Sequence, residues 1–346
     1  MTLTEICENA KNAKYEIAAL STEQKNKALL TVAEALVSEK DKIISANAID
    51  IKKGEENGMH KGLIDRLMLN DKRIEGIAEG LRQVADLPDP IGEVMEEFER
   101  PNGLKIKKVR VPMGVIGIIY ESRPNVTADA FALTFKSGNA TVLKGGSDAI
   151  NSNIAITNII RAALEKEGIN PNAVSIIEDT DRAVTTQFMT MNEYIDVLIP
   201  RGSAGLIRAV VENSTIPVIE TGTGNCHIYV DKEADLEKAI PIIINAKTQR
   251  IGVCNAAESL IVHEDIKDKF LPLFSKAMKE NSVEVRADEK SRNLIENSIP
   301  ATEEDFGKEY LDYIISVKTV GSVDEAIDHI NKYNTFILIS YTRGGA

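Results

Sequence analysis

Apolar positions recur with helical spacing through roughly the first 90 residues. One such series follows Ser21, a typical helix-capping residue, and predicts an amphipathic helix that begins near this serine. A second helix is predicted from Asp71 to Leu87, because Pro88-Asp-Pro90 stops the pattern. Apolar and polar residues then alternate over residues 98–111 around Pro101-Asn-Gly103, which predicts a β-hairpin.

From residue 114 onward, short apolar runs typical of buried strands alternate with helical stretches. Predicted strands occupy residues 114–120, 140–144, 173–177, 195–199, 217–220, 227–230, 259–262 and 314–320. Predicted helices occupy residues 127–136, 149–166, 204–213, 236–247, 265–280 and 323–333. This alternation of strand and helix predicts an α/β protein with a parallel sheet and buried strands.

Composition and charge exclude several classes of function. A chain of 346 residues is long enough for two or three domains. Its 53 acidic and 41 basic residues give a net charge of −12, which argues against nucleic acid or an anionic membrane as partner. Three cysteines without close spacing disfavour a disulfide framework or a zinc site, so we expect no metal. No signal peptide or membrane-spanning run is visible, and we expect a cytoplasmic location.

The usual dinucleotide fingerprint, Gly-x-Gly-x-x-Gly at the start of a helix, is absent. Its nearest approach is Gly222-Thr-Gly224, but a predicted strand follows instead of a helix. Two other turns join a strand end to a helix, one with Lys144, Gly145 and Ser147 and one with Gly202 and Ser203. Each offers backbone N–H groups to a phosphate, and Lys144 adds a cation. A strand-end lysine is often only solvated, but two such turns on one sheet favour a phosphate-bearing cofactor.

Cys254 is the candidate nucleophile. Small residues surround it, so a substrate can approach the backbone closely, and the positive charge of nearby Arg250 favours the thiolate. The alternative is a buried structural cysteine. Cys226 precedes His227 in an apolar strand, so these two side chains point to opposite faces and cannot form a catalytic pair. We expect Cys226 to be a packing residue.

Together these features resemble the aldehyde dehydrogenase superfamily. Glu220 precedes Cys254 by 34 residues, the spacing of the general-base glutamate and nucleophilic cysteine in that superfamily. Four segments more specifically resemble its γ-glutamyl phosphate reductase branch: residues 120–127, 199–207, 225–231 and 245–250. The resemblance runs to about Thr335, where the family's pattern continues and this chain departs from it.

The resemblance implies an aldehyde dehydrogenase-like α/β fold. Residues 1–222 would form a Rossmann-like cofactor domain, with an oligomerisation hairpin at about residues 98–113, and we expect a homo-oligomer. Residues 223–346 would form an α/β catalytic domain that is incomplete at its C-terminal end. The implied activity is NADPH-dependent reduction of glutamyl phosphate, L-glutamyl 5-phosphate, to L-glutamate 5-semialdehyde in proline biosynthesis.

The resemblance also implies roles for individual residues. Cys254 would attack the acyl phosphate, Asn125 would supply an oxyanion amide, and Glu220 would be less needed, since no water attacks in the reductive direction. Substrate-binding residues would be Arg123 and Arg250. Cofactor-binding residues would be Lys144, Gly145, Ser147, Gly202 and Ser203, with NADP(H) preferred because Ser147 stands where NAD-preferring relatives often have a glutamate.

Three alternatives remain open on the sequence. An oxidative aldehyde dehydrogenase would release a free acid, and an acylating reductase would depend on coenzyme A. An inactive remnant would bind a nucleotide without turnover.

Overall fold

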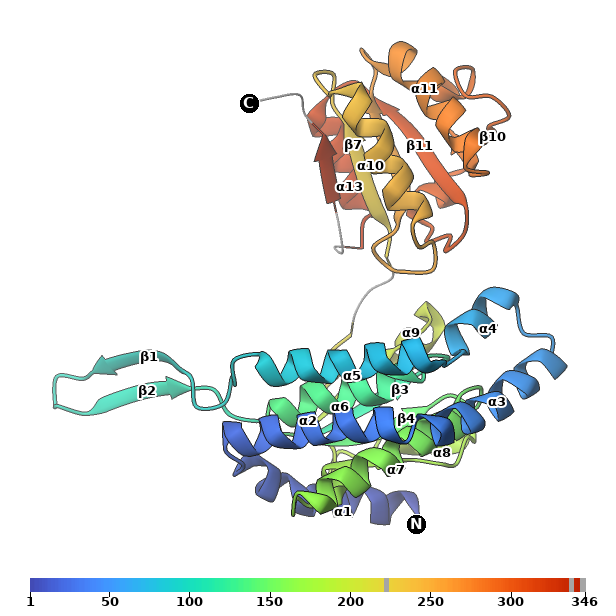
Figure 1. The fold of residues 1–346 in the computed structure, drawn as a ribbon. Coiled ribbons are helices and arrows are strands. Elements are labelled where there is room, and N and C mark those ends of the chain that lie inside the picture. Colours follow the sequence, from blue (N-terminus) through green and yellow to red (C-terminus); the bar gives the residue numbers. More distant parts are fainter. Residues whose placement is uncertain (221–223, 336–338, 343–346) are drawn as a thin grey trace. The chain divides into compact units, whose positions relative to one another are not determined.

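A computed structural model describes residues 1–220, 224–335 and 339–342 of the chain (Figure 1). The chain divides into two compact units, Met1–Thr221 and Gly222–Ala346. This division lies within one residue of the boundary expected from the sequence. Each unit has its own parallel sheet and its own buried core.

The first unit begins with helices, as the periodicity predicts. They are α1 (Leu3–Ala18), α2 (Thr22–Ser38), α3 (Lys40–Glu56), α4 (Lys61–Leu67) and α5 (Asp71–Asp86). Helix α2 starts after Ser21, whose hydroxyl accepts the backbone N–H of Gln24 while the Gln24 side chain accepts that of Ser21. Helix α5 ends just before the two prolines.

A four-stranded parallel sheet with the order β5-β4-β3-β6 forms the centre of this unit. The strands are β3 (Val115–Tyr120), β4 (Ala140–Gly145), β5 (Val174–Ile176) and β6 (Val197–Arg201). The helices between and after them are α6 (Asn125–Lys136), α7 (Ile150–Lys166), α8 (Arg182–Phe188) and α9 (Ala204–Asn213), with a 3₁₀ turn at Pro171–Ala173. Strands β3 and β4 are buried throughout, because helices cover both faces of the sheet: α2, α5, α6 and α7 pack on one and α1 on the other.

One predicted strand of this unit is wrong. Residues 217–220 form only a single parallel bridge, between Val218 and Leu198, and no regular strand. Pro217 has no N–H to donate to a ladder, which limits pairing at this edge.

The predicted hairpin is present, although its strands begin earlier than expected. Strands β1 (Val94–Glu99) and β2 (Lys105–Val109) pair antiparallel, and Gly103 in the connecting turn has φ +82°. Every residue of β1 is exposed. Figure 1 shows the hairpin extending away from the rest of its unit.

The second unit has a six-stranded parallel sheet with the order β10-β9-β11-β8-β7-β12. Its strands are β7 (Cys226–Val230), β8 (Ala257–His263), β9 (Glu284–Ala287), β10 (Ile299–Pro300), β11 (Ile314–Val320) and β12 (Ile339–Thr342). Its helices are α10 (Leu236–Thr248), α11 (Lys267–Glu280), α12 (Glu289–Arg292) and α13 (Val323–Tyr333), with a 3₁₀ turn at Glu303–Gly307. Helices α10 and α11 pack on one face of the sheet and α13 on the other. Among the helices of the described residues, none combines the length and apolar character that a membrane span requires.

Candidate active site

Cys254 lies in the irregular turn that connects α10 to β8, and its side chain is exposed. The turn is closed by a hydrogen bond from the N–H of Ala256 to the carbonyl oxygen of Val253, 3.1 Å long. Cys7 and Cys226 are both buried. Burial raises the pKa of the Cys7 thiol to about 12, so that thiol stays protonated at neutral pH. Of the three thiols, Cys254 is the one that a substrate can reach.

The segment before β7 lies directly against Cys254. A Cβ atom built on Gly224 would be only 1.9 Å from the Cys254 carbonyl oxygen, so no larger residue fits there without displacing the turn. The next contact comes from Cys226, whose thiol donates a hydrogen bond of 3.2 Å to the same carbonyl oxygen. Sequence reasoning treated Gly222-Thr-Gly224 only as a failed nucleotide fingerprint and Cys226 only as a packing residue, so it missed both contacts.

His227, the residue after Cys226, contacts Asn225 and His329. Its Nδ1 atom lies 2.9 Å from the carbonyl oxygen of Asn225, and its ring packs edge-on against His329. Burial lowers the pKa of both histidines to about 4. The Cys226 thiol and the His227 ring thus have different hydrogen-bond partners, and the expectation that they form no catalytic pair stays a prediction.

Three further hydrogen bonds fix the Gly224–Asn225 segment within the second unit. The Gly224 N–H donates to Glu309 Oε1 at 2.9 Å. The Asn225 side-chain amide donates to the carbonyl oxygens of Phe306 and Tyr333 at 2.8 and 2.9 Å. The main chain that Cys254 touches is therefore anchored by residues far away in the sequence. Arg250 is exposed four residues before Cys254, so its guanidinium is accessible to an anionic group.

Lys144 is the penultimate residue of strand β4 in the first unit and is 4% exposed. Its ammonium lies 3.3 Å from the carbonyl oxygen of Gly145. Desolvation lowers the pKa of Lys144, although the charges of Asp179 and Asp181 oppose that effect. A desolvated ammonium gains from a bound anion, so this side chain fits a phosphate-bearing cofactor. Ser147, three residues on, is exposed.

Packing against α7, and not only binding of a cofactor, requires a glycine at position 145. A Cβ atom at this position would be 2.3 Å from the side-chain nitrogen of Asn153, which is buried in α7. The missing side chain makes room for packing between β4 and α7.

Two of the first N–H groups of helix α7 are already occupied by a carboxylate. The buried carboxylate of Asp50, on α3, accepts the backbone N–H groups of Asn151 and Ser152 at 3.2 and 2.8 Å. It also accepts their side chains, at 2.8 and 2.6 Å. A negative charge already caps this helix, so an anion at the same place would be repelled. The Lys144 ammonium and the exposed Ser147 are not engaged by Asp50.

A carboxylate, that of Glu121, also lies at the start of α9. The Ser203 hydroxyl accepts the N–H of Leu206, and the Ser203 N–H donates to Glu121 Oε2 at 2.9 Å. A Cβ atom at Gly202 would be 2.6 Å from the same carboxylate oxygen. Gly202 and Ser203 are exposed, but Glu121 neutralises part of the helix dipole beside them.

The other predicted site residues also lie in the first unit. Asn125 is the first residue of α6, and its amide donates to Asp129 at 2.8 Å. Burial raises the pKa of Asp129. Arg123 is half-buried in the loop before α6, and Glu220 is exposed at the end of the irregular segment that follows Ile216.

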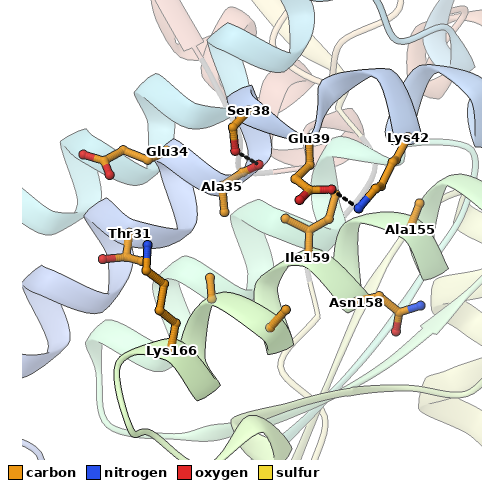
Figure 2. A pocket seen from close by; sticks show the side chains of 12 residues that line it. Thr31, Glu34, Ala35, Ser38, Glu39, Lys42, Ala155, Asn158, Ile159 and Lys166 are labelled. Atoms are coloured by element: carbon orange, nitrogen blue, oxygen red, sulfur yellow. Dashed lines mark hydrogen bonds and ion pairs between the residues drawn. The ribbon is translucent and has the colours of Figure 1, made fainter.

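A cavity of about 610 Å³ lies elsewhere on this unit, among α2, the start of α3 and α7 (Figure 2). Its lining includes an ion pair between Glu39 and Lys42, and α7 contributes alanines together with Asn158, Ile159 and Lys166. None of the predicted site residues lines it. The Cys254 turn of the second unit and the strand-end turns of the first unit are therefore the candidate sites, each within its own unit.

Comparison with known proteins gives consistent matches. The model of the aldehyde dehydrogenase family matches residues 1–296. The γ-glutamyl phosphate reductase of Lachnospira eligens is 58% identical over 96% of this chain and 80% of that protein. The enzyme of the same name from Clostridium beijerinckii is 57% identical over 95% of this chain and 79% of that protein.

Solved structures give a similar result. The crystal structure of γ-glutamyl phosphate reductase from Thermotoga maritima is 49% identical and matches with a TM-score of 0.94 over 99% of this chain and 83% of that chain. An acetylating aldehyde dehydrogenase from Geobacillus thermoglucosidasius is 18% identical, with a TM-score of 0.69 over 99% of this chain and 81% of that chain. At that identity the likeness concerns the fold alone.

Proposed function

Since the chain belongs to the aldehyde dehydrogenase family and, within it, to the γ-glutamyl phosphate reductases, we propose that it reduces L-glutamyl 5-phosphate to L-glutamate 5-semialdehyde with release of phosphate, a step of proline biosynthesis. The observation that carries this proposal is the Cys254 thiol, exposed on a turn whose main chain is held by Gly224 and Cys226.

The proposed nucleophile is the Cys254 thiolate, which attacks the acyl carbon of the substrate. The new C–S bond forms, the bond between that carbon and the phosphate oxygen breaks, and phosphate leaves. The product of this step is a thioester on Cys254. Family membership implies a nicotinamide cofactor, which when bound would supply the hydride that reduces the thioester carbon. The resulting thiohemiacetal then releases the aldehyde and regenerates the thiolate.

Charged and polar groups support the binding of this substrate. The exposed Arg250 guanidinium can form a two-point hydrogen-bonded pair with the phosphate or the α-carboxylate, and Arg123 is the proposed second cation. The developing oxyanion requires donors, for which we propose the Cys254 N–H and the Asn125 amide. Asn125 donates one amide hydrogen to Asp129, and the second hydrogen of the same group is the proposed donor. No base role is proposed for Glu220, since no water attacks in this direction.

For the cofactor we propose NADPH over NADH. The desolvated ammonium of Lys144 and the hydroxyl of Ser147 would bind the ribose 2′-phosphate, with Gly202 and Ser203 beside the remaining phosphates. The Asp50 and Glu121 carboxylates occupy the two helix ends, so side chains and not helix dipoles carry this recognition. We also propose that the chain is a homo-oligomer that associates through the β1–β2 hairpin.

The test runs the reaction in the oxidative direction, with glutamate 5-semialdehyde and NADP⁺. Three parallel assays contain phosphate, coenzyme A or neither. We expect steady NADPH formation only in the assay that contains phosphate. Dependence on coenzyme A would instead identify an acylating dehydrogenase, and steady turnover with neither would identify an enzyme that releases glutamate. Absence of turnover in all three assays would contradict the proposal.

A further inference from the structure

A fully buried ion pair joins the two ends of the Cys254 turn. The ammonium of Lys247, in the last turn of α10, lies 2.6 Å from Glu258 Oε2, and both side chains are 0% exposed. Glu258 is the second residue of β8. The eleven residue steps between these partners include the whole turn that carries Cys254. The pair therefore fixes where the turn leaves the helix and where it enters the strand.

A second connection leads from this pair back to the cysteine. Glu258 Oε1 accepts the N–H of Leu311 at 3.2 Å. Two residues earlier, Glu309 accepts the N–H of Gly224, whose main chain lies against Cys254. Leu311 has φ +53°, a conformation that is costly for a branched residue and that persists only when its surroundings impose it. Glu258 thus holds both the entrance of the strand and the loop that supports Gly224.

Stability alone does not account for this pair. Moving two charges out of water costs free energy, and buried ion pairs are often no more stabilising than apolar residues of the same volume. Lys247 and Glu258 lie on the face of the second-unit sheet that α10 and α11 cover, where Leu260 and Ile243 are fully buried. An apolar pair would pack there without a desolvation cost, but it would fix neither the direction of the chain nor the Leu311 N–H.

Resting on the proposed function of Cys254, we propose that Lys247 and Glu258 are positioning residues that hold the nucleophilic turn in its reactive geometry.

Burial raises the pKa of Glu258 to about 7, against the effect of Lys247, while Glu309 raises it further. Desolvation lowers the pKa of Lys247, and Asp312 opposes this. Tyr310 is a further titratable neighbour of Glu258, and its pKa is raised by burial and by Asp305. Above neutral pH the carboxylate is charged and the pair is complete; below it, the carboxyl group is protonated and the pair weakens.

Alkylation of Cys254 by iodoacetamide tests this proposal without requiring turnover. Cys7 and Cys226 are buried, so the folded chain has one rapidly reacting thiol. We expect the wild-type rate to show, besides the thiol's own ionisation, an inflection near pH 7 from Glu258. Glu258→Gln should lose that inflection, change the alkylation rate several-fold, and lower kcat by about 10²-fold with little change in KM.

Two further variants keep the test decisive. If Glu258→Gln does not fold because Lys247 is left unpaired, the double variant Lys247→Met/Glu258→Gln removes both charges and should show the same altered profile. Lys25→Met serves as a matched control, because it removes the cation of the buried Lys25–Asp89 pair in the first unit. It should lower the melting temperature while leaving the alkylation profile unchanged.

The result that would overturn the proposal is a Glu258→Gln or double variant whose alkylation profile and kcat match those of Lys25→Met, with only the melting temperature lowered. This result can be distinguished from a failure of the proposed function itself. If Cys254→Ala remained active, the thioester mechanism would be wrong, whereas the alkylation profile would still report whether the pair positions the turn.

Discussion

At the residue scale, the contact between Gly224 and Cys254 is the tightest constraint on the candidate site. A methyl group on Gly224 would overlap the Cys254 carbonyl group, so Gly224→Ala must displace the turn. We expect kcat to fall by about 10²-fold, because reacting groups tolerate misplacement of about 1 Å poorly. Steady-state kinetics and the rate of Cys254 alkylation would check this.

A matched control lies within the same turn. A Cβ atom on Gly252 would meet nothing within 4 Å, so Gly252→Ala should fold with a wild-type melting temperature. Wild-type kcat and alkylation in Gly224→Ala would show that the turn does not depend on this approach.

Lys144 supports a second prediction at this scale. Lys144→Ala removes this desolvated ammonium and with it the proposed charge-assisted contact with the 2′-phosphate of NADPH. KM for NADPH should therefore rise roughly tenfold, while KM for NADH changes little. Initial rates with both cofactors would check this. Lys166→Ala, at the exposed end of α7, is the control and should change neither value. A wild-type enzyme that used NADH better than NADPH would contradict the assignment.

At the scale of elements, α7 depends on a residue of another helix for its N-terminal cap. Its own N-cap residue, Ala149, has no side-chain oxygen, and Asp50 on α3 takes that role with four hydrogen bonds. Asp50→Ala should lower the free energy of unfolding by roughly 2 kcal/mol or more, since the buried N–H groups lose their acceptor. Urea denaturation would measure this loss.

The exposed Glu55 on the same helix is the control for that measurement. Glu55→Ala should change the free energy of unfolding by no more than about 0.5 kcal/mol. Equal stability of the Asp50 and Glu55 variants would mean that Asp50 does not cap α7.

How far the sequence predicts these elements depends on how strong and how local each signal is. Long apolar runs and capped helices were predicted well: β11 and α13 have the expected bounds, and the aldehyde dehydrogenase-like fold is confirmed. The four-residue strand β9, with alternating burial, was missed, and residues 217–220 were assigned a strand that Pro217 limits.

The candidate site was predicted in the same uneven way. Cys254 was distinguished from Cys226 by its small neighbours, a local signal. The cap from Asp50 to α7 spans 101 residues, and the bond from Glu309 to Gly224 spans 85. No periodicity or spacing indicates such contacts, so they emerge only from the packed structure.

At the scale of the whole molecule, the exposed β1–β2 hairpin is the expected site of association with another copy of the chain. Three glutamates of β1 pair with three lysines of β2, as in Glu97 opposite Lys107 with 3.2 Å between their charged atoms. Both strands expose apolar side chains, among them Val94, Met95, Phe98 and Val109. A lone two-stranded hairpin is only marginally stable in water, and its edges are open to pairing.

We therefore expect the intact chain to be a homo-oligomer by size-exclusion chromatography with light scattering. Replacing residues 94–109 by a short Gly-Ser linker should give a monomer with an intact core. The single change Phe98→Glu should weaken association, because it places a charge among the exposed apolar groups. An unchanged mass after removal of the hairpin would place the contact elsewhere.

The central claim is that the reaction passes through a thioester on Cys254. Its most direct test is to incubate the chain with glutamate 5-semialdehyde and NADP⁺ in the absence of phosphate, to quench the mixture with acid, and to map the modified peptide by mass spectrometry. We predict one glutamyl group per chain on the peptide that contains Cys254, formed together with one NADPH and removed when phosphate is added. A chain that forms no adduct on this peptide, or a Cys254→Ala variant that still produces NADPH at the wild-type rate, would contradict the account.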